Sequence, residues 1–161
     1  MIWADRLREE IKERFKDEIA QGKELVIRDE KTLSGRVHVG SLRGIVIHGV
    51  IAEILQEEGI KCKFEFELNE FDPMDGLPSA LDKKKYKEHM GKPLFTIPSP
   101  TAEEIKSLGM DISPGENFTS IFAEEIKGVV EKINLPIEFY NLLPLYKEGK
   151  FNECIKDALE N

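Results

Sequence analysis

The chain has 161 residues, of which 40% are hydrophobic and 34% charged, and its formal net charge is −8. This apolar fraction excludes a disordered chain, and the length suits one domain of about 100–200 residues. The acidic balance argues against a freestanding nucleic-acid binder, whose affinity comes from neutralising phosphates. Two cysteines, Cys62 and Cys154, are too few for a disulfide framework or a zinc site. We therefore expect a reduced, cytoplasmic protein without a metal site, and without a membrane partner because no apolar run approaches about 20 residues.

The first elements follow from apolar spacing. Apolar residues four apart predict an amphipathic helix over 3–21, ended by Gly22: Trp3, Leu7, Ile11, Phe15 and Ile19. Leu25-Val26-Ile27 indicates a short buried strand, which the polar residues 28–32 follow. A glycine-containing loop over 33–44 then enters a helix predicted over 42–58, with Gly59 as its left-handed cap.

Residues 60–68 alternate apolar and charged side chains without a break, which predicts a strand. Together with the strand at 25–27 and the helix between them, they form a βαβ unit with a parallel, right-handed crossover. Parallel strands covered on both faces usually lack such regular charges. This strand therefore either faces polar surroundings or lies near an edge of the sheet.

The second half of the chain begins with irregular structure over 69–100, where five prolines occur. A capping box, Thr101 with Glu104, opens a short helix, and a longer amphipathic helix is expected over 119–134. A strand over 137–140 and a last helix over 151–159 complete the pattern. The fold predicted from these elements is a three-layer α/β fold in a single domain over 1–161, with a parallel sheet and flanking helices.

The glycine-containing turn at 34–44 is the strongest chemical signal, because backbone N–H groups at a helix N-terminus favour phosphate. The dinucleotide fingerprint G-x-G-x-x-G is absent, and Gly40 is followed by Ser41 rather than the lysine of a P-loop. What remains is His38-Val39-Gly40-Ser41, whose histidine could donate to a phosphoryl oxygen. From these residues alone, a purely structural histidine stays an equal alternative.

His38-Val39-Gly40-Ser41 resembles the HIGH signature of class I aminoacyl-tRNA synthetases, which opens the first helix of a Rossmann-like (HUP-type) fold. Further segments in the same order resemble the class I, archaeal-type lysyl-tRNA synthetase over essentially the whole chain. These segments are residues 71–78 (FDPMDGLP), 91–100 (GKPLFTIPSP), 122–125 (FAEE) and 145–153 (LYKEGKFNE). The chain would then be the N-terminal half of a catalytic domain.

The resemblance implies ATP-dependent activation of lysine and its transfer to tRNA-Lys, with Mg²⁺ accompanying ATP. It gives catalytic roles to His38 and Ser41. Residues expected to bind ATP are Ser34, Gly35, His38, Gly40 and Ser41. Residues expected to bind the lysine substrate are Thr32, Glu70 and Asp72. A carboxylate has a physical reason to face an ammonium group, although Asp72-Pro73 is equally compatible with a plain turn.

The chain also departs from the family pattern. Glu30 and Lys31 stand where the family has small residues, and Glu125 where it tends to have histidine. The family's KMSKS loop and anticodon-binding region lie later, and these 161 residues contain no Lys-Met-Ser sequence. We therefore expect a fragment that is inactive alone, with a possible second polypeptide carrying the KMSKS half. The alternatives are a fragment of another, arginyl-like class I synthetase, or a catalytically inert module that binds nucleotide, tRNA or a partner.

Overall fold

A computed structural model describes residues 2–161, which divide into two compact units. The sheet unit comprises the residues up to Lys31, Val37–Glu67 and Gly128–Tyr140. The loop unit comprises Thr32–Arg36, Leu68–Lys127 and Asn141–Asn161. The expectation of a single domain over 1–161 stays a prediction.

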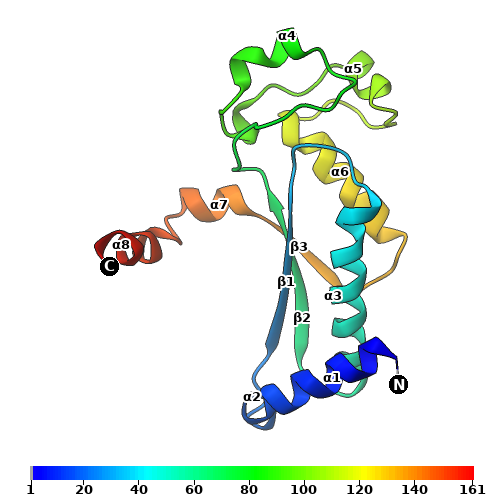
Figure 1. The fold of residues 1–161 in the computed structure, drawn as a ribbon, viewed down its shortest axis with the longest axis vertical. Helices are drawn as coiled ribbons and strands as arrows, with labels where there is room; N and C mark the ends of the chain where they lie inside the picture. Colours follow the sequence, from blue (N-terminus) through cyan, green and yellow to red (C-terminus); the bar gives the residue numbers. More distant parts are fainter. Residues whose placement is uncertain (1) are drawn as a thin grey trace. The chain divides into compact units, whose positions relative to one another are not determined.

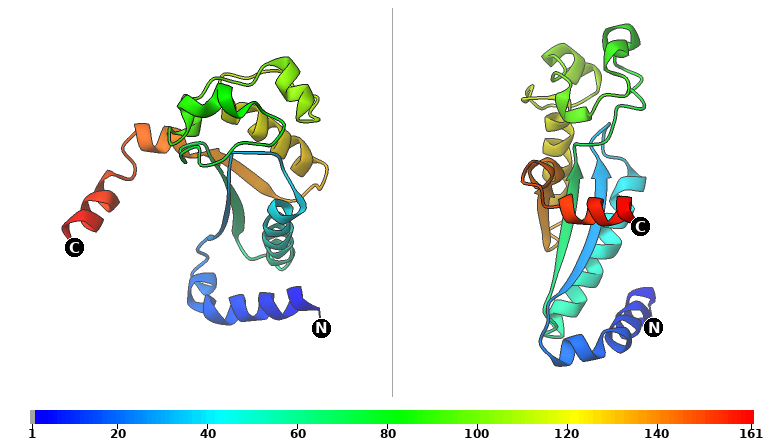
Figure 2. Two further views of the ribbon diagram at one scale, coloured as in Figure 1. Left: turned by 45° about the horizontal axis from the view of Figure 1, so that its top comes forward. Right: turned by 90° about the vertical axis from the view of Figure 1, so that its left-hand side faces the viewer.

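A three-stranded parallel sheet forms the centre of the sheet unit, in the order β1-β2-β3. The strands are β1 (Leu25–Thr32), β2 (Cys62–Asn69) and β3 (Ile137–Asn141). Helix α3 (Val39–Glu57) runs along one face of the sheet (Figures 1 and 2). His48 of α3 meets the ring of Phe64 edge-on, with centroids 5.7 Å apart, and the Cys62 thiol donates to the Ala52 carbonyl at 3.4 Å. The predicted α/β class with a parallel sheet and flanking helices is confirmed.

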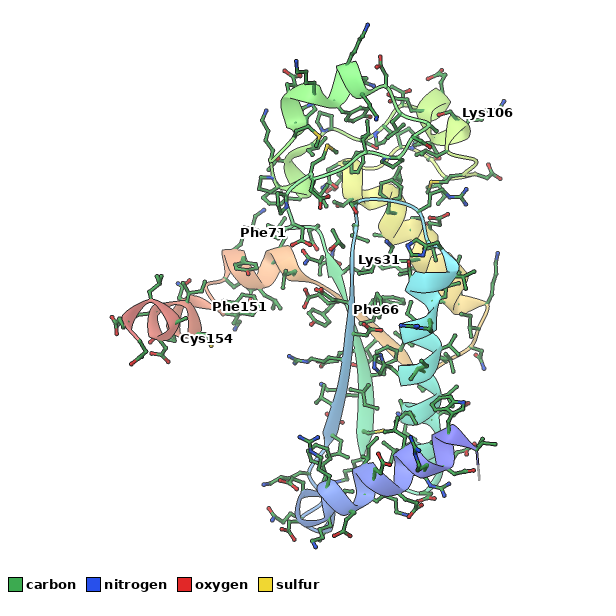
Figure 3. All side chains as sticks on the ribbon, viewed as in Figure 1. Lys31, Phe66, Phe71, Lys106, Phe151 and Cys154 are labelled. Atoms are coloured by element: carbon green, nitrogen blue, oxygen red, sulfur yellow. The ribbon has the colours of Figure 1, made fainter. Side chains whose placement is uncertain are left out.

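Strand β2 is the central strand, so its position near an edge, one of two predicted alternatives, is wrong. One face of β2 is buried and includes Phe66, labelled in Figure 3. The charged side chains of the other face are half-buried and have partners on the neighbouring strands. Arg28 donates to Glu65 at 3.0 Å, and the Tyr140 hydroxyl donates to Glu67 at 2.8 Å. Cross-strand pairing therefore accommodates the charges in a central strand.

The N-terminal helical segment is two helices rather than one. α1 (Trp3–Arg14) and α2 (Lys16–Ala20) are separated at Phe15, whose backbone leaves helical geometry. Helix α1 lies against the C-terminal end of α3, where Lys12 and Arg8 approach Glu58 at 2.6 and 3.2 Å. Gly59, with φ +76°, ends α3 in the left-handed conformation that the sequence predicts.

Helix α3 is long and apolar enough to cross a membrane when judged by length and composition alone. Core helices of soluble proteins pass the same test. Here Ile45, Ile51, Ala52 and Leu55 are buried within the sheet unit. The helix itself is predicted over 42–58, but the expectation that no apolar run approaches about 20 residues did not take it into account, because Arg43 and His48 interrupt its apolar residues.

The loop unit contains short helices separated by irregular chain. They are α4 (Lys83–Tyr86), the 3-10 turns η1 (Lys87–His89) and η2 (Leu94–Thr96), α5 (Ala102–Ser107), α7 (Leu142–Lys147) and α8 (Asn152–Glu160), together with most of α6 (Phe118–Glu131). The predicted capping box of α5 is confirmed, since Glu104 N donates to the Thr101 hydroxyl at 3.3 Å and Thr101 N to the Glu104 carboxylate at 2.8 Å. The irregular backbone is held by its own hydrogen bonds, such as Met74 N to Lys92 O and Gly91 N to Met74 O.

A row of stacked aromatic rings joins α7 to this irregular chain. Phe71 stacks on Phe95 and on Tyr146, with ring centroids 5.6 and 4.4 Å apart, and Tyr146 contacts Phe151 at 4.7 Å. Figure 3 labels Phe71 and Phe151, which lie on either side of α7. The segment that follows β2 is therefore packed against α7 by side chains from well-separated parts of the sequence.

Candidate functional site

The predicted site residues fall into two groups, one in each unit. The signature turn, His38 to Ser41, belongs to the sheet unit. The substrate loop, Thr32 to Arg36, belongs to the loop unit, as do Glu70 and Asp72. Each group has its own geometry.

His38 is the N-cap of α3. Its backbone is extended (φ −136°, ψ 168°), and its Nδ1 accepts a hydrogen bond from the Ser41 backbone N–H at 3.2 Å. An Nδ1 that accepts carries no proton, so in the neutral imidazole the proton is on Nε2. The side chain is exposed. The cap thus leaves an exposed ring with an N–H donor beside the helix N-terminus, where the aligned peptide dipoles favour anions.

Gly40 lies close to the ring of His38. A Cβ atom at Gly40 would lie 3.0 Å from both Cε1 and Nδ1 of that ring, closer than nearly all real Cβ contacts. A larger residue would push the imidazole away from its capping position. This gives the H-x-G spacing a structural reason, besides the contact of Gly40 with ATP that the resemblance implies.

The exposed side of α3 next to Gly40 is apolar. A groove of about 700 Å³ lies there, lined by Val39, Gly40, Leu42, Arg43, Val46 and Ile47. Val39 is 86% exposed, which is unusual for a valine in a helix that also contributes to a core. The signature glycine therefore faces an apolar surface with one cation, Arg43, along it.

The substrate loop is tied to the segment after β2. The Thr32 hydroxyl donates to the Asp72 carboxylate at 2.6 Å, and Leu33 N donates to Asn69 O at 3.0 Å. Asn69 is 7% exposed, and its side-chain oxygen accepts from the backbone N–H groups of Phe71 and Asp72 at 3.0 and 3.2 Å. This turn aims Asp72 at Thr32. Asp72 is half-buried.

Glu70 has a different environment from Asp72. It is 4% exposed, and its carboxylate accepts from Asn141 Nδ2 at 3.1 Å and from the backbone N–H groups of Leu142 and Leu143 at 3.2 Å each. These are the first N–H groups of α7, which have no partner within the helix. Glu70 is therefore the acidic cap of α7, a role that the sequence did not predict, and its contact with a lysine substrate stays a prediction.

The remaining predicted residues are less constrained. Ser34, Gly35 and Ser41 are half-buried. A Cβ at Gly35 would meet Pro78 at an ordinary 3.9 Å, so the structure does not itself demand glycine there. Sequence reasoning gave no role to Arg36, which ends the substrate loop and donates to Glu125 at 2.7 Å. The sequence feature that could have indicated a role for Arg36 is its position two residues before His38.

The described residues, 2–161, contain no group of three or more His, Cys, Asp or Glu side chains that could hold a metal ion. Cys62 is a buried core residue, as predicted from its strand, and burial raises the pKa of its thiol. Cys154 is exposed on α8. Neither cysteine is part of the two groups described above.

Comparison with known proteins shows which family the chain belongs to. A family model described as "tRNA synthetases class I (K)" matches residues 1–161. The chain belongs to this family. The resemblance inferred from the signature and the later segments is confirmed.

Curated relatives named "Lysine--tRNA ligase" occur in several archaea. The relative from Pyrococcus furiosus is 30% identical over 98% of this chain and 27% of its own length. Relatives from Methanosarcina barkeri (strain Fusaro) and Thermococcus kodakarensis are each 29% identical over 98% of this chain and 26% and 27% of their own lengths. The chain thus spans about a quarter of the length of the curated relatives it matches. The family is one of aminoacyl-tRNA ligases, and these names favour the lysyl-type over the arginyl-like alternative.

Proposed function

We propose that the chain is the N-terminal part of the catalytic domain of a lysine–tRNA ligase. In this reaction the lysine carboxylate attacks the α-phosphate of ATP, pyrophosphate leaves, and the lysyl group then passes to the 3′ end of tRNA-Lys. The observation that carries the proposal is the match of all 161 residues to the class I (K) family.

We assign ATP to the signature turn of the sheet unit. The Nε2–H of His38 is a donor for a phosphoryl oxygen, and Ser41, at the third position of α3, adds a hydroxyl at the helix N-terminus. The apolar groove beside Gly40 suits the adenosine moiety. Ser34 and Gly35 are proposed as further ATP contacts. Mg²⁺ would accompany the phosphates of ATP.

We assign the lysine substrate to Thr32 and Asp72. The carboxylate of Asp72, oriented by Asn69 and the Thr32 hydroxyl, provides a fixed negative charge for an ammonium group. The second carboxylate expected there, Glu70, already accepts three N–H donors. Recognition of the ammonium group in this part of the chain therefore depends on Asp72 more than on Glu70.

Stabilisation of the transition state also needs the family's KMSKS residues. We propose that they come from the rest of a longer chain or from a second polypeptide, in the reducing cytoplasm where Cys62 and Cys154 stay free. The 161 residues alone are then expected to bind ligand but not to charge tRNA. Robust lysine-dependent exchange of pyrophosphate into ATP by the pure chain would contradict this.

Two variants of His38 test the nucleotide site. His38→Ala removes both the helix cap and the Nε2–H donor, whereas His38→Asn restores a good N-cap without an imidazole. Calorimetric titration with ATP should show about tenfold weaker binding for both, which corresponds to ~1.4 kcal/mol. Only His38→Ala should also lose about 1 kcal/mol of stability, the usual value of an N-cap.

The outcomes separate the candidate functions. Native affinity for ATP in His38→Asn would reduce His38 to a helix cap and refute its catalytic role. A stable native chain that binds no ATP, alone or with the KMSKS part of a relative added, would favour the inert binding module.

A further inference from the structure

Arg36 connects three segments of the loop unit. Its Nε and Nη2 atoms both lie 2.7 Å from Oε1 of Glu125 on α6. Its Nη1 donates to the carbonyl oxygen of Leu108, the C-cap of α5, at 2.8 Å. One guanidinium thus joins the end of the substrate loop to Leu108 and Glu125, which are 72 and 89 residues away in sequence.

This ion pair differs from the ordinary surface pairs of the chain. The Glu125 side chain is only 9% exposed, whereas the Arg36 side chain is 45% exposed. A carboxylate that is nine-tenths buried is held there because a cation pairs with it. The Leu108 carbonyl is at a helix C-terminus, where positive charge is favoured. Gly109, with φ +72°, leaves room, since a Cβ there would be 3.2 Å from Arg36 Nη1.

The pair fixes one end of a loop whose other end is fixed separately. Thr32 and Leu33 are tied to Asp72 and Asn69, as described above. Ser34 and Gly35 lie between these contacts and Arg36, so their backbone is held from both sides. Arg36 thus adds side-chain contacts at the second end of this segment.

We propose that Arg36 and Glu125 are a positioning pair for the substrate loop. They keep Ser34 and Gly35 in one conformation before ligand arrives, so that the entropy of ordering this segment is not lost on binding. The inference rests on the proposed function, since the loop is assigned there to ATP and lysine. It adds two residues that do not themselves touch substrate.

Three variants of the 161-residue chain test the pair, and a second ion pair provides a matched control. Arg36→Lys keeps the charge but cannot reach Glu125 and Leu108 together, Glu125→Gln keeps an acceptor oxygen without the charge, and a double variant combines both. The control changes are Arg28→Lys and Glu65→Gln, because Arg28 donates to one oxygen of Glu65 in the same way, at 3.0 and 2.9 Å, on the sheet.

Hydrogen exchange of the Ser34, Gly35 and Arg36 amides, measured without ligand, reports the loop directly. Titration with ATP and with lysine reports its consequence. In both Arg36→Lys and Glu125→Gln these amides should exchange about tenfold faster than in the native chain. Both variants should also bind ATP and lysine about tenfold more weakly, a size that coupling between contacting residues allows. The double variant should equal the worse single variant, and the control variants should match the native chain.

The two hypotheses fail in different ways. If the native chain binds ligand and the variants bind it equally well, the positioning role is refuted while the proposed function stands. If the native chain binds neither ligand, even with the KMSKS part of a relative added, the proposed function fails, and faster exchange in the variants would still support the ordering of the loop by Arg36. Unchanged exchange in the variants overturns the inference in either case.

Discussion

The cap of α7 by Glu70 gives a prediction that decides between a structural role and a substrate role. Glu70→Ala removes a buried carboxylate that accepts from Asn141 Nδ2, Leu142 N and Leu143 N. Each buried donor left without a partner costs about 1–3 kcal/mol. Two backbone N–H groups and one amide are affected, and water reaches the exposed Asn141. The expected loss in the free energy of unfolding is therefore about 2–6 kcal/mol.

Urea denaturation followed by circular dichroism measures this loss. Glu70→Gln, which keeps one acceptor oxygen, should lose less than Glu70→Ala, and Asp75→Ala, at an exposed position, should be neutral. A loss below about 1 kcal/mol for Glu70→Ala would refute the capping argument, since that is the value of one ordinary hydrogen bond. If Glu70→Gln instead abolished lysine binding at full stability, Glu70 would be a substrate ligand, as the resemblance predicts.

Two further predictions concern the sheet unit. Gly49→Ala places a Cβ 2.6 Å from Leu135 Cδ1 and should lower the free energy of unfolding in urea by about 1–3 kcal/mol. Gly128→Ala, whose Cβ would meet nothing within 4 Å in α6, should not lower it. Burial raises the pKa of Glu67 above its ordinary 4.5, although the Tyr140 hydroxyl opposes this. The folded state then holds the Glu67 proton more tightly, so stability falls as pH rises from 4.5 through the raised pKa. Glu67→Gln should remove this fall, so that the variant is more stable than the native chain at pH 7 but not at pH 4. The difference in the free energy of unfolding is ~1.4 kcal/mol for each unit by which the pKa is raised. Equal gains in stability at both pH values would contradict this.

The elements that the sequence predicts correctly are those whose signal is local. The unbroken alternation of 60–68 gives β2, the capping box gives α5, and Gly59 gives the end of α3. The turn at 34–44 is also correctly predicted to lead from a strand into a helix, because apolar spacing identifies the elements on both sides of it. In each case the residues that determine the structure lie within one or two turns of each other.

The elements that were missed depend on distant partners. The strand predicted from the sequence covers only residues 25–27, yet β1 continues to Thr32 beside β2, where Arg28 pairs with Glu65. Helix α7 was not predicted, since Pro144 interrupts a short apolar segment. Proline is tolerated in a first helical turn, and here Glu70, more than 70 residues away, accepts the N–H groups of that turn.

Glu70 and Asp72 show most clearly where a sequence ceases to specify a site. They are two residues apart after the same strand, they carry the same group, and the sequence assigns them one role. Asn69 sets the turn that separates them. One carboxylate then meets α7, at a separation of 72 and 73 residues, and the other meets Thr32, at a separation of 40. Because a carboxylate that accepts three N–H donors has little capacity left for an ammonium group, the choice between these partners, rather than the acidic cluster itself, decides that the proposed contact with lysine falls to Asp72.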